Sequence, residues 1–303
     1  MLYVALGAQA VLVVAAYWLE TRAGAGERDG AVRRALLWSG VWLLLGLLPT
    51  LWFGLVEGAH SASSYAAVYL IERALSLDNV FVFAVLIAAF EIPGAERDRL
   101  VSFGALSAFA LRVPAIVLGV AVFEASHFVG YVLGALLLVL AWQTARSRED
   151  QAPAPNRVVS FLQRRLPVSE HVPRRWLVNR DGRREVTPML LCLIAIMLAD
   201  LAFAVDSIPA ALAISHDAKL LLVGNLLALL GLRALFKLVS VARERLMYMD
   251  QTIAVLLLLV GVKLLAADAV EVGPLASLAA VVIVLAAGTL VSLRASSTRV
   301  AQR

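Results

Sequence analysis

Cysteine and histidine are both scarce in this chain. Its 303 residues include one cysteine, Cys192, and four histidines. A single thiol excludes an intrachain disulfide and a CxxC metal or redox motif. The sequence also contains no nucleophile with a neighbouring base and no glycine-rich phosphate loop, so it does not predict an enzyme.

Charged residues are few as well. Asp, Glu, Lys and Arg make up 16% of the chain, whereas 61% of its residues are hydrophobic. Soluble domains are usually about 45–50% apolar. The excess lies in repeated apolar runs of about 18–25 residues, the length that crosses a hydrocarbon core of about 30 Å. The composition therefore predicts an all-α, polytopic membrane protein.

The arginines lie between these apolar runs, so the net charge of +5 is a topology signal and not a sign of a nucleic-acid partner. The first run lacks the basic residues that precede the core of a cleaved signal peptide, and we expect it to be a retained helix. We predict about nine transmembrane helices, at residues 2–19, 35–56, 64–90, 101–122, 127–145, 188–215, 220–240, 252–270 and 274–293.

The connecting loops alternate in charge. Arginines occur in loops 20–34, 91–100, 146–187 and 241–251 and in the tail after residue 293. The intervening loops have neither Lys nor Arg, apart from one Lys in 216–219. Because cytoplasmic loops are enriched in Lys and Arg, this pattern predicts that the N-terminus lies outside and the C-terminus in the cytoplasm.

The longest polar segment, residues 146–187, carries ten arginines and five acidic residues. We predict a basic cytoplasmic loop that divides the membrane part into two halves, with a short amphipathic piece at 158–166. The loop either lies against anionic lipid headgroups or offers a surface to membrane or cytoplasmic protein partners.

Two segments in the two halves resemble each other. ERALSLDNV (Glu72–Val80) and DLAFAVDSI (Asp200–Ile208) both read acid, five residues, Asp, a small polar residue and a β-branched residue. The loop charges orient them oppositely, which predicts two inverted three-helix repeats (helices 3–5 and 6–8) with a site at the midplane. The predicted division is 1–60 N-terminal two-helix segment, 61–145 first repeat, 146–187 basic loop, 188–270 second repeat and 271–303 C-terminal helix and tail.

Carboxylates inside the membrane segments are costly and usually face a bundle interior or a water-filled cavity. Six residues separate Glu72 from Asp78, and Asp200 from Asp206. On a helix this spacing turns the side chains about 120° apart and separates them by about 9 Å, so two acids of one helix cannot hold one ion. We expect Asp78 to pair with Asp206 at the centre, with Glu72 and Asp200 a layer away.

A fold-stabilising ion pair is the alternative role for these acids, with Arg73, Arg112 or Arg233 as the partner. Asn79 and Ser207, which follow Asp78 and Asp206, favour a ligand role instead.

Oxygen donors dominate this region. Pro209 removes the hydrogen bond to the Val205 carbonyl beside Asp206, unless it serves only as a plain kink in a membrane helix. Carboxylate, carbonyl and amide oxygens suit Mg²⁺, Ca²⁺ or Mn²⁺. Asn225 offers a further amide oxygen or an interhelical hydrogen bond. Lys263 either compensates the charge of an empty carboxylate site or extends toward the membrane interface.

At these motifs the sequence resembles the TerC family, named for tellurium resistance. The resemblance covers about residues 64–145 and 188–268 and includes GNLLALLGLRAL and LLLVGVKLL. It implies a cytoplasmic (inner) membrane protein, related to the LysE transporter superfamily, that exports Mn²⁺ or another divalent cation. We expect no cofactor. The residues that the resemblance implies are Glu72, Asp78, Asp200, Asp206, Asn79, Ser207 and Asn225. Many members have a Glu where this chain has Met197, so one carboxylate of the usual set is missing.

Two functions follow from these expectations. The first is a secondary transporter that exports a divalent cation, most simply Mn²⁺, by proton-coupled alternating access through intramembrane carboxylates. The alternative is a non-transporting membrane scaffold of a metal or tellurite stress-response complex, which delivers metal to other proteins through loop 146–187. The expected partners are a divalent metal ion and the lipid bilayer, with no nucleic acid.

Overall fold

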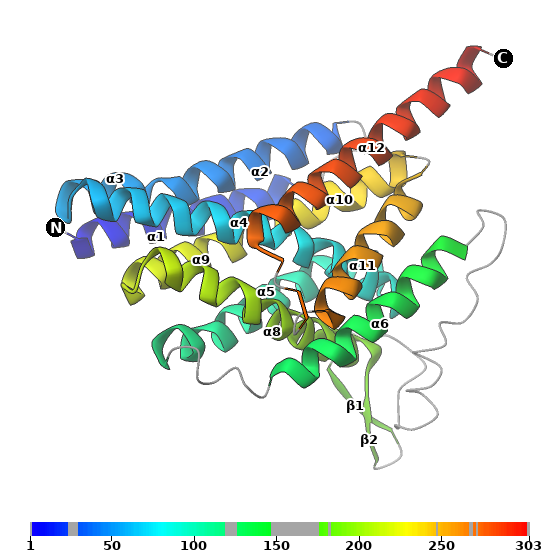
Figure 1. Ribbon diagram of the computed structural model, residues 1–303, viewed down its shortest axis with the longest axis horizontal. Coiled ribbons are helices and arrows are strands. Elements are labelled where there is room, and N and C mark those ends of the chain that lie inside the picture. The colour runs from blue at the N-terminus through cyan, green and yellow to red at the C-terminus, as the bar shows by residue number, and fades with distance from the viewer. Residues whose placement is uncertain are drawn as a thin grey trace.

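The computed structural model describes residues 2–23, 30–118, 126–146, 176–180, 183–246, 248–266, 269–270 and 272–301. Most of them lie in helices, which pack side by side in a bundle (Figure 1). The helices are α1 Leu2–Ala23, α2 Ala31–Leu47, α3 Pro49–Val56, α4 Ala59–Ala89, α5 Gly94–Leu118, α6 Ser126–Arg146, α8 Pro188–Ile214, α9 Ala218–Leu230, α10 Leu232–Arg245, α11 Met249–Leu265 and α12 Pro274–Ala301.

The described helices coincide with the apolar runs of the sequence. By length and composition, two helical stretches of the described chain are able to cross a membrane, Ala31–Val56 and Ala218–Arg243. The pair Pro188–Ala204 and Ser207–Ile214, which is bent by 42°, makes a third if it counts as one span. The architecture agrees with an all-α integral membrane protein, while the count of nine crossings and the inverted repeats stay predictions.

The start of α8 follows directly from local chemistry. Thr187 is its N-cap, and its hydroxyl accepts a hydrogen bond from the Leu190 amide at 3.3 Å. Pro188 stands at the first helical position, where a missing N–H costs nothing. Pro209 lies inside α8 and does not end it, and the 42° bend lies one turn earlier, between Ala204 and Ser207.

Helix α4 is the centre of the bundle and packs against α3, α8, α9 and α10. Its second half is hydrophobic on every side, and residues 80–87 are all buried. A helix that is apolar all round must be enclosed by other helices or by lipid. The buried core around it places the polar residues of its first half deep inside the protein.

Helices α6 and α11 cross at two glycines. A Cβ at Gly134 would lie 3.0 Å from the Gly261 carbonyl oxygen, and a Cβ at Gly261 would lie 3.1 Å from the Gly134 carbonyl oxygen. Small residues at such crossings let two membrane helices approach closely. The backbones of α6 and α11 therefore approach closely at this crossing.

A short antiparallel hairpin, which the sequence analysis did not predict, precedes α8. Strands β1 (Leu177–Arg180) and β2 (Arg183–Val186) pair with Leu177 opposite Val186. At its base the Thr187 hydroxyl donates to the Trp176 carbonyl at 2.9 Å. The hairpin projects from the bundle beside α6 and α8 (Figure 1). The predicted amphipathic piece at 158–166 lies outside the described residues.

Candidate functional site

A polar stripe runs along the first half of α4. Glu72, Ser76 and Asn79 stand at positions i, i+4 and i+7, which place their side chains on one face of a helix. All three are buried. The stripe faces the protein interior, so it must find its partners on neighbouring helices.

Helices α5 and α8 supply those partners. Arg112 of α5 and Asp200 of α8 are exposed by only 2% and 0%. Ser207 lies seven residues after Asp200, and it is buried too. Seven residues complete about two turns of a straight helix, but α8 bends by 42° between the two residues, so this spacing alone does not fix the direction of Ser207.

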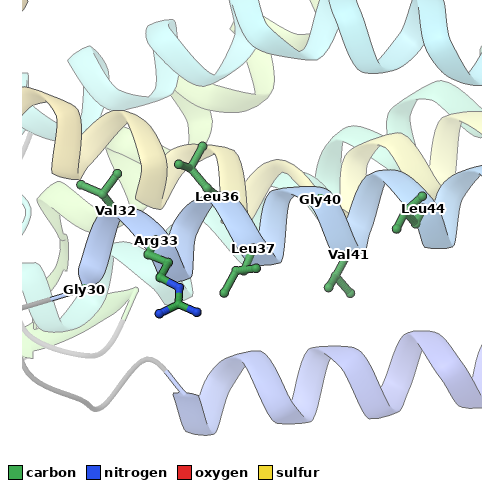
Figure 2. Close-up of a pocket in the computed structure, with 8 residues that line it drawn as sticks. All are labelled: Gly30, Val32, Arg33, Leu36, Leu37, Gly40, Val41 and Leu44. Carbon is green, nitrogen blue, oxygen red and sulfur yellow. The ribbon is translucent and has the colours of Figure 1, made fainter.

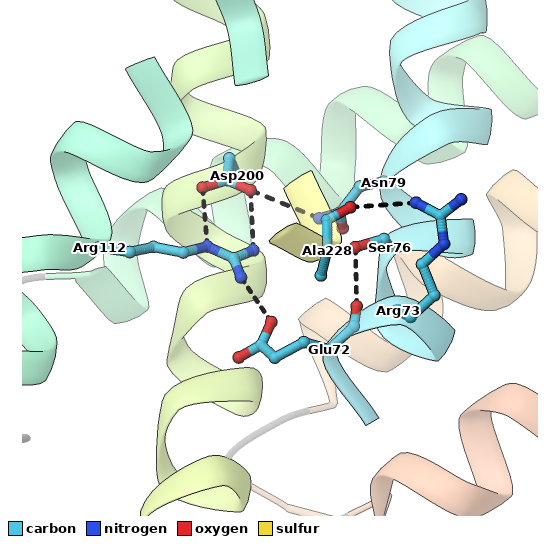
Figure 3. A network of polar contacts seen from close by, with 7 residues as sticks. All are labelled: Glu72, Arg73, Ser76, Asn79, Arg112, Asp200 and Ala228. Carbon is cyan, nitrogen blue, oxygen red and sulfur yellow. Dashed lines mark hydrogen bonds and ion pairs between the residues drawn. The ribbon is translucent and has the colours of Figure 1, made fainter. Parts of the chain in front are cut away.

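Arg112 bonds two carboxylates at once (Figure 3). Its Nε and Nη2 donate to the two oxygens of Asp200 at 3.2 and 2.8 Å, and its Nη1 donates to Glu72 Oε2 at 2.8 Å. The Asn79 amide donates to Asp200 Oδ1 at 3.4 Å. Three helices from both halves of the chain therefore meet at one guanidinium.

The charges of this triad do not cancel. With both carboxylates ionised, Glu72 and Asp200 carry two negative charges, and Arg112 carries one positive charge. Buried charges are costly unless they are paired and hydrogen-bonded, and the fork of a guanidinium provides both. One negative charge remains, and it makes the site attractive to a cation.

A second arginine ties α4 to the break between α9 and α10. Arg73 Nη1 donates to the Ala228 carbonyl at 3.1 Å, in the last turn of α9 (Figure 3). Carbonyls in a last turn lack helical partners and carry partial negative charge. A Cβ at Gly231 would overlap the Arg73 guanidinium, so the glycine between the two helices makes room for it. Ser76 bonds the Glu72 carbonyl at 2.7 Å and so turns its hydroxyl back onto α4.

Two buried polar side chains near these helices have no satisfactory partner within the described part of the chain. The Asn225 amide lies beside the Glu72 carboxylate, but neither of its polar atoms makes a hydrogen bond of normal geometry. The Ser207 hydroxyl makes none either. Unsatisfied buried polar atoms are rare and call for an explanation such as an ion or a water molecule.

The structure places the other predicted residues as follows. Asp78 and Asp206 lie on α4 and α8, and their side chains are outside the described residues. Lys263 of α11 is half-buried, and its Nζ lies 3.5 Å from the Ser277 hydroxyl of α12. The charge that meets Glu72 and Asp200 is Arg112. Among the described residues no three His, Cys, Asp or Glu side chains lie close enough to hold a metal ion by themselves.

The sequence analysis gave a fold-stabilising ion pair as the alternative role of the acids. Glu72 and Asp200 make this ion pair with Arg112. Its signal was Arg112 itself, because an arginine inside an apolar run requires an anion on a neighbouring helix. The seven-residue step from Glu72 to Asn79 was a second signal, since it identifies the buried face of α4.

A groove along α2 offers no comparable chemistry. It has a volume of about 670 Å³ and is lined by one arginine, two glycines and apolar side chains. Figure 2 shows Arg33, Leu37 and Val41 on the same side of α2. Leu37 and Val41 are exposed, as expected for a surface that faces lipid. This groove lacks the oxygen ligands that a hard cation needs.

Comparison with known proteins gives one family. The family model described as "Integral membrane protein TerC family" matches residues 57–300. The thylakoid membrane protein TERC of Arabidopsis thaliana is 37% identical over 248 residues, which are 81% of this chain and 65% of that protein. The chain therefore spans less than two thirds of that relative.

Two bacterial relatives are covered more fully. A membrane protein of Myxococcus xanthus is 32% identical over 266 residues, which are 86% of this chain and 82% of that protein. Alx of Escherichia coli strain K12, a candidate membrane-bound redox modulator, is 34% identical over 253 residues, 80% of this chain and 79% of its own length. No solved structure matches the chain.

Proposed function

Because the chain belongs to the TerC family of integral membrane proteins, we propose that it is a secondary transporter that exports Mn²⁺ or a similar divalent cation across the cytoplasmic membrane. One observation carries the proposal. A buried cluster of two carboxylates and one guanidinium joins both halves of the chain, and among the described residues the Asn225 amide beside Glu72 makes no hydrogen bond of normal geometry.

The chemistry of the cluster supports a hard cation. Apart from the Arg112 guanidinium, its described groups are carboxylate, amide and hydroxyl oxygens, which suit Mn²⁺ and Mg²⁺ better than thiolate or imidazole would. The free thiol Cys192 is buried in the apolar core of α8. Met197, which stands where many members have a Glu, brings no oxygen to the site.

The proposed ligand set extends beyond the triad. Asp78 and Asp206 bring further carboxylates on α4 and α8, and Asn79, Ser207 and Asn225 bring neutral oxygens. The three neutral side chains are each at most 2% exposed. Because the set is divided between helices of both halves, a movement of one half against the other would open the ligands to alternate sides.

Transport by purified protein tests the proposal. Liposomes that contain the wild-type chain should accumulate ⁵⁴Mn²⁺ down a gradient without any other protein. Asp206→Asn should reduce the rate by roughly tenfold or more, because it removes a carboxylate from a desolvated site. The matched control is Asp250→Asn, the same chemical change at an exposed ion pair with Arg243, which should leave transport unchanged.

Two results would contradict different parts of the proposal, and the first of them would favour the scaffold. If folded wild-type protein moves no divalent cation in liposomes, the chain is not a stand-alone carrier. If Asp206→Asn transports Mn²⁺ at the wild-type rate, the assigned ligands are wrong even though the protein is a transporter.

A further inference from the structure

We propose that Arg112 is a tethered counter-cation that competes with the transported divalent ion for Glu72 and Asp200. The guanidinium must leave these carboxylates when the ion enters, and it helps to expel the ion when it returns. This inference rests on the proposed function and assigns the residue that limits ion affinity.

The geometry sets the two occupants in competition. Arg112 hydrogen-bonds three of the four carboxylate oxygens of Glu72 and Asp200. A divalent cation would coordinate the same oxygens at about 2.0–2.6 Å, which brings it close to the guanidinium. Two cations that close repel each other strongly inside a poorly solvated site, so binding of one disfavours the other.

The charge balance favours such an exchange. With Arg112 in place the two carboxylates keep one negative charge, and with a divalent cation in its place they are neutral. The displaced guanidinium keeps its positive charge, so the exchange limits the desolvation cost only if Arg112 moves to solvent or to another anion. An uncompensated pair of carboxylates would carry two negative charges, and this exchange avoids that state.

The backbone near the triad is interrupted on both sides of the site. Pro114 lies inside α5 two residues after Arg112, so the Ala110 carbonyl lacks its helical donor. Helix α8 bends by 42° between Ala204 and Ser207, one turn after Asp200. Interrupted hydrogen-bond ladders are the usual places where membrane helices bend. The two helices that Arg112 joins are therefore not continuous rigid rods.

An arginine that only stabilises the fold should not respond to ion binding. Arg73 is the internal comparison, because it is also buried and it bonds a backbone carbonyl of α9. Neither carboxylate of the triad bonds Arg73 in the described contacts, so ion entry gives that side chain no reason to move. If Arg112 only stabilises the fold, it too should keep its position when the ion binds.

The first experiment measures Mn²⁺ binding to purified protein by calorimetry. Arg112→Gln should bind Mn²⁺ roughly tenfold more tightly than wild type, because a competitor that occupies the site most of the time lowers the apparent affinity in proportion. Arg112→Lys should fall between them, since an ammonium cannot bond both carboxylates in the same fork. Arg243→Gln, at the exposed ion pair, is the matched control and should bind like wild type.

The second experiment uses the wild-type chain, so it holds even if Arg112→Gln does not fold. Arginines are modified with phenylglyoxal with and without Mn²⁺ and are quantified by mass spectrometry. Mn²⁺ should increase modification of Arg112 at least severalfold and leave Arg73 unchanged. Mn²⁺ binding with unchanged modification of Arg112 overturns this inference alone, and so does Arg112→Gln protein that binds Mn²⁺ no more tightly than wild type. Folded wild-type protein that binds no divalent ion overturns the proposed function with it.

Discussion

Single buried side chains hold the first helices to the rest of the bundle. The Trp42 indole of α2 donates to Glu20 Oε2 of α1 at 2.9 Å, and both residues are 1% exposed. Tyr65 of α4 donates to the Gly46 carbonyl of α2 at 2.7 Å. Each bond satisfies a group that would otherwise be buried without a partner, so its loss should cost more than an average hydrogen bond.

Trp42→Phe tests this cost. The substitution keeps an aromatic ring but leaves the Glu20 oxygen without its donor, and we expect a loss of about 1–3 kcal/mol in stability. Thermal unfolding in detergent measures it. Trp52→Phe is the matched control, because the Trp52 indole makes no hydrogen bond in the described structure. Equal effects of the two substitutions would show that ring size, and not the bond to Glu20, accounts for the loss.

At the site, the polar residues are predictable from the sequence, whereas their partners are not. Glu72, Asp200 and Asn79 were identified because polar residues inside an apolar run are unusual. The sequence does not decide whether Asp200 bonds Arg112. The two residues are 88 positions apart, and spacing within one helix says nothing about a partner so distant. Only the packing of α5 against α8 decides it.

Helices were predictable where the local signal is strong. The predicted segment 188–215 matches α8, Pro188–Ile214, because a threonine cap and a proline mark its start. The hairpin of β1 and β2 lies in segment 146–187, for which the sequence analysis predicts only a basic polar loop. Its signal was Asp181-Gly182 between two short strands, a pair that favours two-residue hairpin turns.

The crossing of α6 and α11 gives a prediction for whole elements. Gly134→Ala should destabilise the protein by about 1–3 kcal/mol, because the new methyl group would press on the Gly261 carbonyl and on Leu265. Gly40→Ala is the control, since nothing lies within 4 Å of a Cβ at that position. Alanine favours a helix over glycine by about 1 kcal/mol, so the control should be neutral or slightly stabilising. Equal melting temperatures for the two variants would contradict a tight crossing.

In the whole molecule, helices from the two sides of loop 146–187 pack against each other. α4 and α5 each contact both α8 and α9, and α6 contacts α8 and α11. These contacts join the two halves, but they do not single out pairs of equivalent helices. The inverted orientation of the halves stays a prediction, because it depends on which side of the membrane each loop occupies.

Cysteine labelling tests that orientation in intact cells. In a Cys192→Ala background, Ala59→Cys and Arg243→Cys each introduce one exposed thiol, at residues predicted to lie outside and in the cytoplasm. A membrane-impermeant maleimide should label the variant with Ala59→Cys in intact cells, and the variant with Arg243→Cys only after permeabilisation. The reverse pattern would invert the predicted topology, and labelling of both in intact cells would show that the helix count is wrong.

The contacts of Arg112 also have a consequence for biosynthesis. Glu72 and Arg112 are 40 residues apart, whereas Asp200 follows Arg112 by 88 residues. As the chain leaves the ribosome, the glutamate and the arginine therefore reach the membrane first and are able to neutralise each other during insertion. The aspartate joins a pair that is already formed. The second carboxylate bound by Arg112 thus arrives only when the second half of the protein is inserted.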